Sequence, residues 1–274
     1  MLLKYATGLT GSGPVGRVVA AAAAKNVTPV TIELGSKSPV FIDAGNTDIE
    51  LAAKRILWGK HQNAGQICVA PDYILIPRAH SRGVHEGVPR VLAPTRRHHA
   101  RILELLRRTQ GKIVHGGNAE GTKRIEPTLV TDVGLDDPLM EDELFGPIIP
   151  LVPVDDVHEA IQIIRGRPVP LVIYVFTDSE DTKNKFLEST SSGTLVLNDT
   201  FMQLGVHEMP FGGQGESGYG SYLGKFSFDT FVNRRSYINV PPAAEPFLQY
   251  RYPPYTEDAF QALSAPANIK IPEH

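Results

Sequence analysis

Short apolar runs alternate with amphipathic helical segments along most of the chain. The apolar runs predict strands over residues 29–34, 40–43, 73–77, 112–114, 171–176 and 194–197. Helical spacing of apolar residues predicts helices over residues 15–25, 48–62, 97–109, 157–164 and 183–189. The strands show no strict alternation of apolar and polar residues, which is typical of a parallel sheet covered by helices on both faces. We therefore predict an α/β fold.

Two stretches of the chain break this alternation. Residues 78–97 are basic and show no periodicity, so we expect a solvated loop there. The tail after Pro241 is rich in proline, which fixes φ and lacks a backbone N–H. We expect the tail to form an extended segment on the surface.

Composition excludes several classes of protein. The 274 residues are 42% hydrophobic and 21% charged, as in an ordinary globular protein, and the net charge of −3 argues against a nucleic-acid-binding protein. The sequence has no apolar run of about 18 residues that would predict a transmembrane segment, and its first residues do not resemble a signal peptide. A single cysteine cannot form an internal disulfide, so we expect a cytoplasmic protein. We identify no metal-ligating set of residues.

The one cysteine and one of the carboxylates stand next to glycines. Cys68 follows Gly65, and Glu33 precedes Gly35. A thiol is a strong nucleophile when its surroundings favour the thiolate, and glycine lets the backbone come close to a ligand. The pair suggests a nucleophile and a general base held on tight turns. The alternatives are a small buried hydrophobic residue for Cys68 and a carboxylate capping the following turn for Glu33.

Residues 11–16 match the pattern G-x-G-x-x-G and precede a predicted helix. In a Rossmann domain this pattern follows a hydrophobic strand, and an acidic residue in the place of Glu33 binds the ribose. The residues before Gly11 form a poor strand, because Gly8 interrupts them and they lie too close to the terminus to be central in a sheet. We therefore disfavour a Rossmann dehydrogenase, although N–H groups at a helix N-terminus suit a phosphate.

Six short motifs follow one another along the chain. They are Thr10-Gly11-Ser12, Glu33-Leu34-Gly35-Ser36-Lys37-Ser38-Pro39, Gly65-Gln66-Ile67-Cys68-Val69-Ala70-Pro71, Glu143-Leu144-Phe145-Gly146-Pro147, Asn198-Asp199 and Pro210-Phe211-Gly212-Gly213. With them the chain resembles the aldehyde dehydrogenase family, closest to its class 3 and fatty-aldehyde branch, from about Gly11 to Arg235 with a break at residues 79–97. The resemblance implies a catalytic domain with a parallel sheet at residues 33–233. A remnant of the dinucleotide-binding domain would precede it at residues 1–32, and a bridging strand and proline-rich tail would follow at residues 234–274.

The resemblance also implies a thiohemiacetal mechanism. Cys68 would attack the aldehyde carbon, and its backbone N–H would be one donor to the resulting alkoxide. Hydride would pass to NAD or NADP, and Glu33 would activate the water that hydrolyses the thioester. Asn198 would bond to the backbone beside Cys68. The implied cofactor-binding residues are Gly11, Ser12, Gly13, Pro14, Val15, Gly16, Leu34, Glu143 and Phe145, of which Glu143 and Phe145 would hold the nicotinamide ribose.

The implied partners are an aldehyde, either medium- or long-chain or aromatic, and a second copy of the chain in a homodimer. Residues 234–240 resemble a strand that would pair with the other protomer.

The sequence also departs from the family pattern. Ser36 stands where the family has glycine, so we expect a strained or reshaped turn. Residues 79–97 do not resemble the corresponding segment of the family. Family members carry about one more domain before Thr10, which supplies an asparagine donor for the alkoxide and the residues that bind the adenosine ribose. We therefore expect this chain to be a poor enzyme, and the alternative is an inactive truncated fragment that acts as a folding or oligomer-forming module.

Overall fold

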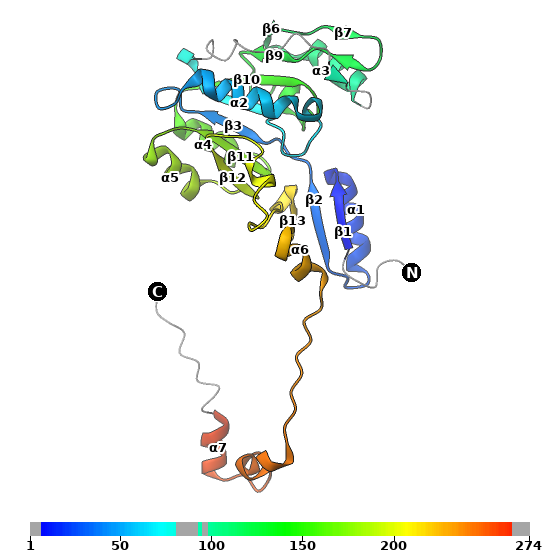
Figure 1. Cartoon of the computed structure of the whole chain (residues 1–274), viewed down its shortest axis with the longest axis vertical. Coiled ribbons are helices and arrows are strands. Elements are labelled where there is room, and N and C mark those ends of the chain that lie inside the picture. Colours follow the sequence, from blue (N-terminus) through cyan, green and yellow to red (C-terminus); the bar gives the residue numbers. More distant parts are fainter. Residues whose placement is uncertain (1–6, 81–92, 95–97, 265–274) are drawn as a thin grey trace. The chain divides into compact units, whose positions relative to one another are not determined.

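The computed structural model describes residues 7–80, 93–94 and 98–264 (Figure 1). By its internal contacts the chain divides into two compact units, Met1–Val232 and Asn233–His274, and each is described by itself.

A seven-stranded sheet forms the centre of the first unit. Its strand order is β12-β11-β3-β4-β10-β9-β6, and all neighbouring strands are parallel except β6, which runs antiparallel to β9. The predicted parallel sheet is confirmed. The strands are β3 Pro39–Ile42, β4 Tyr73–Pro77, β6 Lys112–His115, β9 Thr128–Thr131, β10 Ile148–Val154, β11 Val172–Phe176 and β12 Thr194–Leu197.

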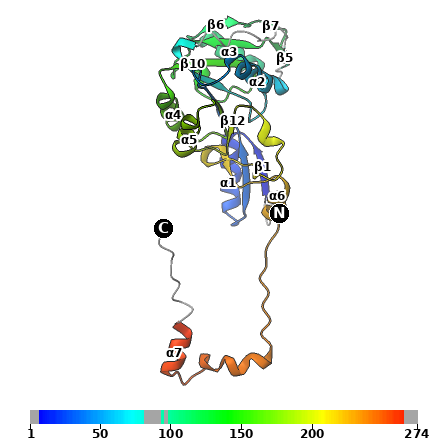
Figure 2. The same cartoon turned by 60° about the vertical axis from the view of Figure 1, so that its left-hand side comes forward.

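Helices cover both faces of this sheet (Figures 1 and 2). On one face α2, Ile49–His61, packs on the strands in a core that contains Ile56 and Val40. On the other face α3, α4 and α5 pack in a core that contains Phe41. Neighbouring strand residues therefore enter different cores, which explains the continuous apolar runs. The three helices are α3 His99–Arg108, α4 Val157–Arg165 and α5 Glu180–Ser189.

Side chains cap three of these helices. Asp48 accepts the N–H of Leu51 at the start of α2, so the helix begins at Ile49, one residue after the predicted start. Asp156 caps α4 and Ser179 caps α5 in the same way. The Ser179 cap places the start of α5 at Glu180, three residues before the predicted start.

A smaller sheet has the order β1-β2-β13. Strands β1 Thr7–Gly11 and β2 Val30–Leu34 are parallel and joined by α1 Gly13–Ala24, whereas β13 Gly218–Tyr219 runs antiparallel to β2. Helix α1 lies beside β1 in both views (Figures 1 and 2). The prediction of a poor strand before Gly11 is wrong, because this segment pairs with β2 along its whole length. Its place at the edge agrees with its nearness to the terminus.

Several elements were not expected from the pattern. Strands β9 and β10 belong to the large sheet, and a separate antiparallel sheet has the order β5-β8-β7. Most of the loop expected at residues 78–97 lies outside the described residues, but its residues Ala93–Pro94 form β5, so that prediction is wrong there. The remaining elements of the first unit are β7 Ala119–Glu120, β8 Arg124–Ile125, α6 Gly224–Phe231, and the 3-10 helices η1 Gln62–Gly65, η3 Pro138–Met140, η4 Met202–Leu204 and η5 Gly215–Ser217.

The second unit contains more helix than its prolines predict. Residues 233–240 form neither helix nor strand and are exposed. The elements that follow are η6 Pro242–Phe247, η7 Gln249–Arg251 and α7 Glu257–Ser264. The prediction of an extended tail is wrong for these residues, because Pro242 occupies a first helical turn, where no N–H is needed, and Thr256 accepts the N–H of Ala259 at 3.2 Å. Pairing of residues 234–240 with another protomer stays a prediction.

Across the described ranges of both units, no helix has the length and apolar character needed to cross a membrane.

Candidate active site

A left-handed turn carries the chain from α2 to Cys68. Asn63, Ala64 and Gly65 have φ values of 47°, 56° and 74°. The side chains of Asn63 and Gln66 each donate to the other residue's carbonyl, at 3.1 and 3.0 Å. A Cβ on Gly65 would collide with the carbonyl oxygen of Gly146. The glycine before the cysteine is thus needed for a close backbone approach, and the partner is the backbone of another motif.

The thiol of Cys68 is half-buried and lies against the core on the α2 face of the sheet. Burial raises its pKa to about 11, and the nearby carboxyls of Glu143 and then Glu33 act in the same direction. The backbone N–H groups of Cys68 and Val69 oppose the shift by bonding to the thiolate. In this environment the thiol carries its proton at neutral pH, so a base must remove it during attack.

The side chain of Tyr174, itself bonded by Gln203, holds the backbone next to the cysteine. Tyr174 of β11 donates its hydroxyl to the carbonyl of Val69 at 2.7 Å and accepts the side-chain amide of Gln203 at 3.1 Å. Both residues are buried, so these two hydrogen bonds are shielded from water.

Glu33 lies in β2, opposite Thr10 of β1 and Gly218 of β13. Its side chain is buried, and its Oε1 accepts the backbone N–H of Gly213 at 3.1 Å. Oε2 is buried without a hydrogen-bond partner among the described residues. Burial raises the pKa of Glu33 to about 7, although the Gly213 hydrogen bond lowers it. A carboxyl with this pKa and one free oxygen suits a general base near neutral pH.

Glu143 approaches Cys68 from the segment before β10. A Cβ on Gly35 would collide with its carboxylate, so this turn leaves room for Glu143 only because residue 35 is glycine. Burial raises the pKa of Glu143 to about 8, Asp72 adds to the shift, and the backbone N–H of Ser36 opposes it. The structure thus brings together Cys68, Glu33 and Glu143, which the sequence places far apart.

Phe145 follows Glu143 by two residues. It has a φ of 49°, which is unusual for an aromatic residue, and its half-buried ring forms a T-shaped pair with the ring of His98, with centroids 5.2 Å apart and an interplanar angle of 71°. The strained backbone constrains the direction of this ring.

The glycine-rich segment lies where β1 turns into α1. Ser12 is the N-cap of α1 but makes no side-chain capping bond, and the N–H of Gly35 donates to the carbonyl of Gly11 at 3.2 Å. A Cβ on Gly16 would come within 2.6 Å of Leu34, so this glycine permits close packing of helix on strand. Pro14 and Val15 are exposed on the first turn. The segment therefore borders the turn that holds Glu143.

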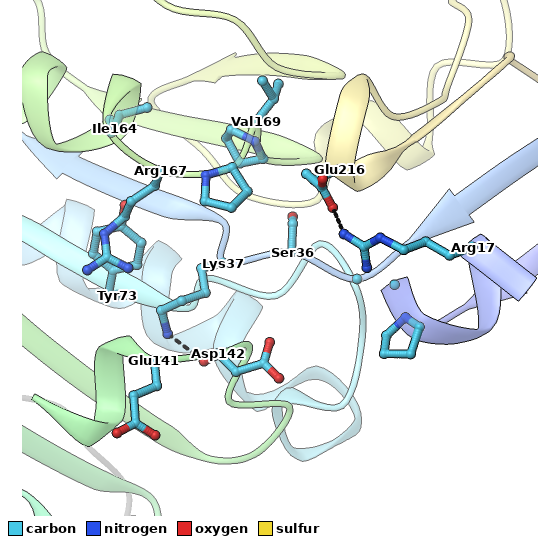
Figure 3. Close-up of a pocket in the computed structure, with 15 residues that line it drawn as sticks. Arg17, Ser36, Lys37, Tyr73, Glu141, Asp142, Ile164, Arg167, Val169 and Glu216 are labelled. Carbon is cyan, nitrogen blue, oxygen red and sulfur yellow. Dashed lines mark hydrogen bonds and ion pairs between the residues drawn. The ribbon is translucent and has the colours of Figure 1, made fainter. Parts of the chain in front are cut away.

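A pocket of about 340 Å³ opens beside this turn (Figure 3). Gly13 and Pro14 line it together with Gly35, but Cys68 and Glu33 do not. Figure 3 shows Arg17 pointing toward Glu216, with which it forms an ion pair, and Lys37 bonded to the carbonyl of Asp142. The cations of this pocket are thus already paired with protein groups.

Two expectations about supporting residues need correction. The side chain of Asn198 bonds the N–H and carbonyl of Thr177, at 2.8 and 2.9 Å, and not the backbone beside Cys68, because β12 runs next to β11. Ser36 does not have a positive φ, so of the strained or reshaped turn that we expected, the strain is absent and the reshaping stays a prediction. Its hydroxyl accepts the N–H of Leu171 at 2.8 Å, a bond that glycine could not make.

The sequence analysis did not single out Lys60, Asp72 or Tyr174. Lys60 is 1% exposed and donates to the carbonyl of Pro71 at 2.8 Å. A signal for it exists in the sequence, because Lys60 follows Ile56 and Leu57 at helical spacing and so falls on the buried face of α2. In the described part of the chain no group of His, Cys, Asp and Glu side chains is arranged to hold a metal ion.

Comparison with known proteins gives consistent relatives. Residues 6–97 and 84–237 match the model of the aldehyde dehydrogenase family. A rat protein named aldehyde dehydrogenase, dimeric NADP-preferring, is 42% identical over 260 residues, which cover 89% of this chain and 57% of the rat protein. A Dictyostelium discoideum protein named aldehyde dehydrogenase family 3 comG is 41% identical over 262 residues, with 90% and 56% covered.

Among solved structures, the substrate-bound state of Staphylococcus aureus AldH is similar with a TM-score of 0.78 and 36% identity. The similarity covers 90% of this chain and 60% of the S. aureus chain. The chain thus spans somewhat more than half the length of the relatives that it matches.

Proposed function

The chain belongs to the aldehyde dehydrogenase family, and from this premise we propose that it oxidises an aldehyde to a carboxylic acid with NAD or NADP. Cys68 is the nucleophile and Glu33 the general base. The observation that carries the proposal is the meeting of a half-buried thiol with the buried carboxyl of Glu33 and the half-buried carboxyl of Glu143, both close enough to act on the pKa of the thiol.

Glu33 has the features that both of its steps require. As the sulfur of Cys68 bonds to the aldehyde carbon, the thiol proton passes to the unpartnered Oε2 of Glu33, directly or through water. The backbone N–H of Cys68 donates to the developing alkoxide. Glu33 releases this first proton to solvent before the second step. After oxidation to the thioester, Oε2 takes a proton from water as the water oxygen attacks the acyl carbon, and when the C–S bond breaks the Cys68 thiolate takes that proton back. The pKa of about 7 lets Glu33 take up and release this proton near neutral pH.

The described residues also fit a nicotinamide dinucleotide, which accepts the hydride when bound. The carboxylate of Glu143, which occupies the space left by the missing Cβ of Gly35, would accept hydrogen bonds from ribose hydroxyls. Phe145 would pack on the sugar, and Leu34 would lie beside the nicotinamide. The segment Gly11–Gly16, at the start of α1, would present backbone N–H groups to the diphosphate.

The finer assignments follow from the same residues and relatives. We propose a medium- or long-chain or an aromatic aldehyde as the substrate, and a homodimer as the assembly, supported by the rat relative whose name calls it dimeric. The free thiol of Cys68 is compatible with a reducing compartment such as the cytoplasm.

The function is tested by following the absorbance of reduced nicotinamide with a medium-chain aldehyde and either NAD or NADP. We expect aldehyde-dependent reduction, slow in this chain, that Cys68→Ser abolishes. Reduction that persists in Cys68→Ser, or none above a no-protein control with either cofactor, contradicts the proposal.

A further inference from the structure

The segment that carries Glu143 and Phe145 belongs to no helix or strand. Residues 141–147 lie between η3 and β10 and form neither kind of element. Such a segment has no regular ladder of backbone hydrogen bonds to fix it, so its peptide groups need other partners. Those partners decide how Glu143 and Phe145 are directed.

Two side chains from outside the segment bond to its peptide groups. Arg101 of α3 donates from Nη1 to the carbonyl of Glu143 at 3.3 Å and from Nη2 to the carbonyl of Leu144. Asp72 accepts the N–H of Leu144 at 2.9 Å. The peptide group between Glu143 and Leu144 is thus held at both its carbonyl and its N–H, and the next peptide group is held at its carbonyl.

The guanidinium of Arg101 suits this place because of its shape. It is planar and carries its donors in a rigid fork, so one side chain can bond two carbonyls at once. A lysine ammonium on a flexible stem has no such fork. Arg101 therefore fixes two successive peptide groups relative to each other.

The bond to the carbonyl of Leu144 acts directly on the strained residue. The φ of Phe145, which is 49°, describes the rotation of this residue against the peptide group that precedes it. A positive φ is unfavourable for an aromatic residue, which would relax if the preceding peptide group could turn. Because Arg101 holds the carbonyl of that peptide group, it opposes the relaxation.

Helix α3 also supports the segment by packing. Ile102 lies so close to Gly146 that a Cβ there would come within 2.0 Å of its side chain. The ring of His98, at the start of the helix, pairs with the ring of Phe145. The hydrogen bonds of Arg101 thus lie between two packing contacts of the same helix.

We propose that Arg101 is a positioning residue that acts through Glu143 and Phe145. By holding the two carbonyls it keeps the carboxylate of Glu143 packed against Gly35 and keeps Phe145 in its left-handed backbone conformation. The use of these two residues to hold a ribose rests on the proposed function, whereas the hold of Arg101 on the segment does not.

A double-mutant cycle with Gly35 tests this hold. In Gly35→Ala the new Cβ meets the carboxylate of Glu143, and the loss of stability depends on whether the segment can move away. Arg101→Lys keeps the charge but removes the fork. We expect the fall in the equilibrium constant of folding caused by Gly35→Ala to be smaller in Arg101→Lys than in the wild type, by a factor of about three or more. Additive effects in urea denaturation overturn the proposal.

Arg107→Lys is the matched control for this cycle. Arg107 lies on the same helix, is exposed, and bonds to Glu104. We expect Gly35→Ala to have the same effect in Arg107→Lys as in the wild type. An equal coupling in both arginine variants would assign the effect to a general loosening of α3 and overturn the role of Arg101.

Steady-state kinetics then separate positioning from mere stabilisation. Because Glu143 and Phe145 would hold the ribose, we expect Arg101→Lys to raise the KM for NAD or NADP about tenfold and to leave the KM for the aldehyde unchanged. An unchanged cofactor KM overturns the positioning role. If the wild type binds neither NAD nor NADP, the proposed function fails, while the cycle with Gly35 still decides whether Arg101 holds the segment.

A measurement on the wild type covers the case in which Arg101→Lys does not fold. The guanidinium of Arg101 is observed by NMR in ¹⁵N-arginine-labelled protein and assigned through its backbone resonances. We expect separate resonances for the hydrogens on each Nη, because bonds from both nitrogens to carbonyls slow the rotation of these groups. Averaged resonances overturn the proposal.

Discussion

The backbone N–H of Gly213 donates to Oε1 of Glu33 at 3.1 Å, and Oε2 of the same carboxyl is buried without a partner in the described part of the chain. One hydrogen bond thus orients the carboxyl while one oxygen stays available to a proton. Because Gly213 belongs to the motif Pro210–Gly213, that motif would act on the proposed chemistry through Glu33.

The pH dependence of thioester hydrolysis follows from this arrangement. Burial raises the pKa of Glu33 to about 7, and only its deprotonated form can take a proton from water. After acylation of Cys68 by an activated ester such as p-nitrophenyl acetate, we expect the rate of deacylation to rise with pH and level off above about pH 7. A rate that falls as pH rises through this range would exclude Glu33 as the base.

Alkylation by iodoacetamide tests the carboxyls around the thiol. At about pH 9 both Glu143 and Glu33 are ionised and raise the pKa of Cys68, Glu143 more strongly. We expect Glu143→Gln to speed alkylation severalfold, up to about tenfold per unit of pKa, and Glu33→Gln to have a smaller effect. The rates are measured by mass gain, with denatured protein as a reference. Equal rates in all three proteins would place the carboxyls away from the sulfur.

A side chain at residue 35 should displace the carboxylate of Glu143. In Gly35→Ala the new Cβ collides with the carboxylate of Glu143, and we expect a loss of about 1–3 kcal/mol in the free energy of unfolding. Cofactor affinity should fall as well. Gly45→Ala is the matched control, because a Cβ at Gly45 meets no atom within 4 Å. Both variants are compared by urea denaturation. Equal stability of the two would contradict the close packing of Glu143 against Gly35.

Glu143 also links stability to pH. Its folded pKa of about 8 lies above the ordinary 4.5, so the stabilisation it gives is fully present below about pH 4.5 and is lost as pH rises through 8. Relative to the wild type, Glu143→Gln should therefore become more stable between pH 5 and 8, by at most about 1.4 kcal/mol per pH unit. Glu188→Gln, at an exposed position, should show no such trend in the same urea series.

Most strands of the large sheet could be predicted because helices cover both of its faces, which makes each strand a continuous apolar run in the sequence. Val40 and Ile42 enter one core and Phe41 the other, so the strand is apolar throughout. Strand β10 was missed because Pro150 and Pro153 argue against a central strand. The strand forms despite these prolines because each half pairs with a neighbouring strand. Ile148–Pro150 pairs with β9, and Leu151–Val154 pairs with β4.

The motifs predicted which residues belong to the candidate site, but they did not predict the contacts between those residues. Spacing does not reveal that Gly65 touches Gly146 or that Glu143 rests on Gly35, because these contacts join segments far apart in the sequence. Asn198 was assigned to the wrong neighbour because its role depends on β12 lying beside β11. Lys60 was overlooked because a lysine is normally exposed, and only its place on the apolar face of α2 marks it as buried.

Trapping the acyl group tests the proposed division of labour between Cys68 and Glu33 most directly. The Glu33→Gln variant is mixed with p-nitrophenyl acetate, the reaction is quenched, and the peptide that contains Cys68 is weighed by mass spectrometry. Glu216→Gln is the control, because it removes an exposed carboxylate that pairs with Arg17. We expect acetyl-Cys68 to accumulate in Glu33→Gln, with release slowed about 10²–10⁴-fold, and to turn over in the wild type and in Glu216→Gln. Equal turnover in Glu33→Gln and the wild type, or acetylation of other residues with Cys68 unmodified, would contradict the roles of Cys68 and Glu33.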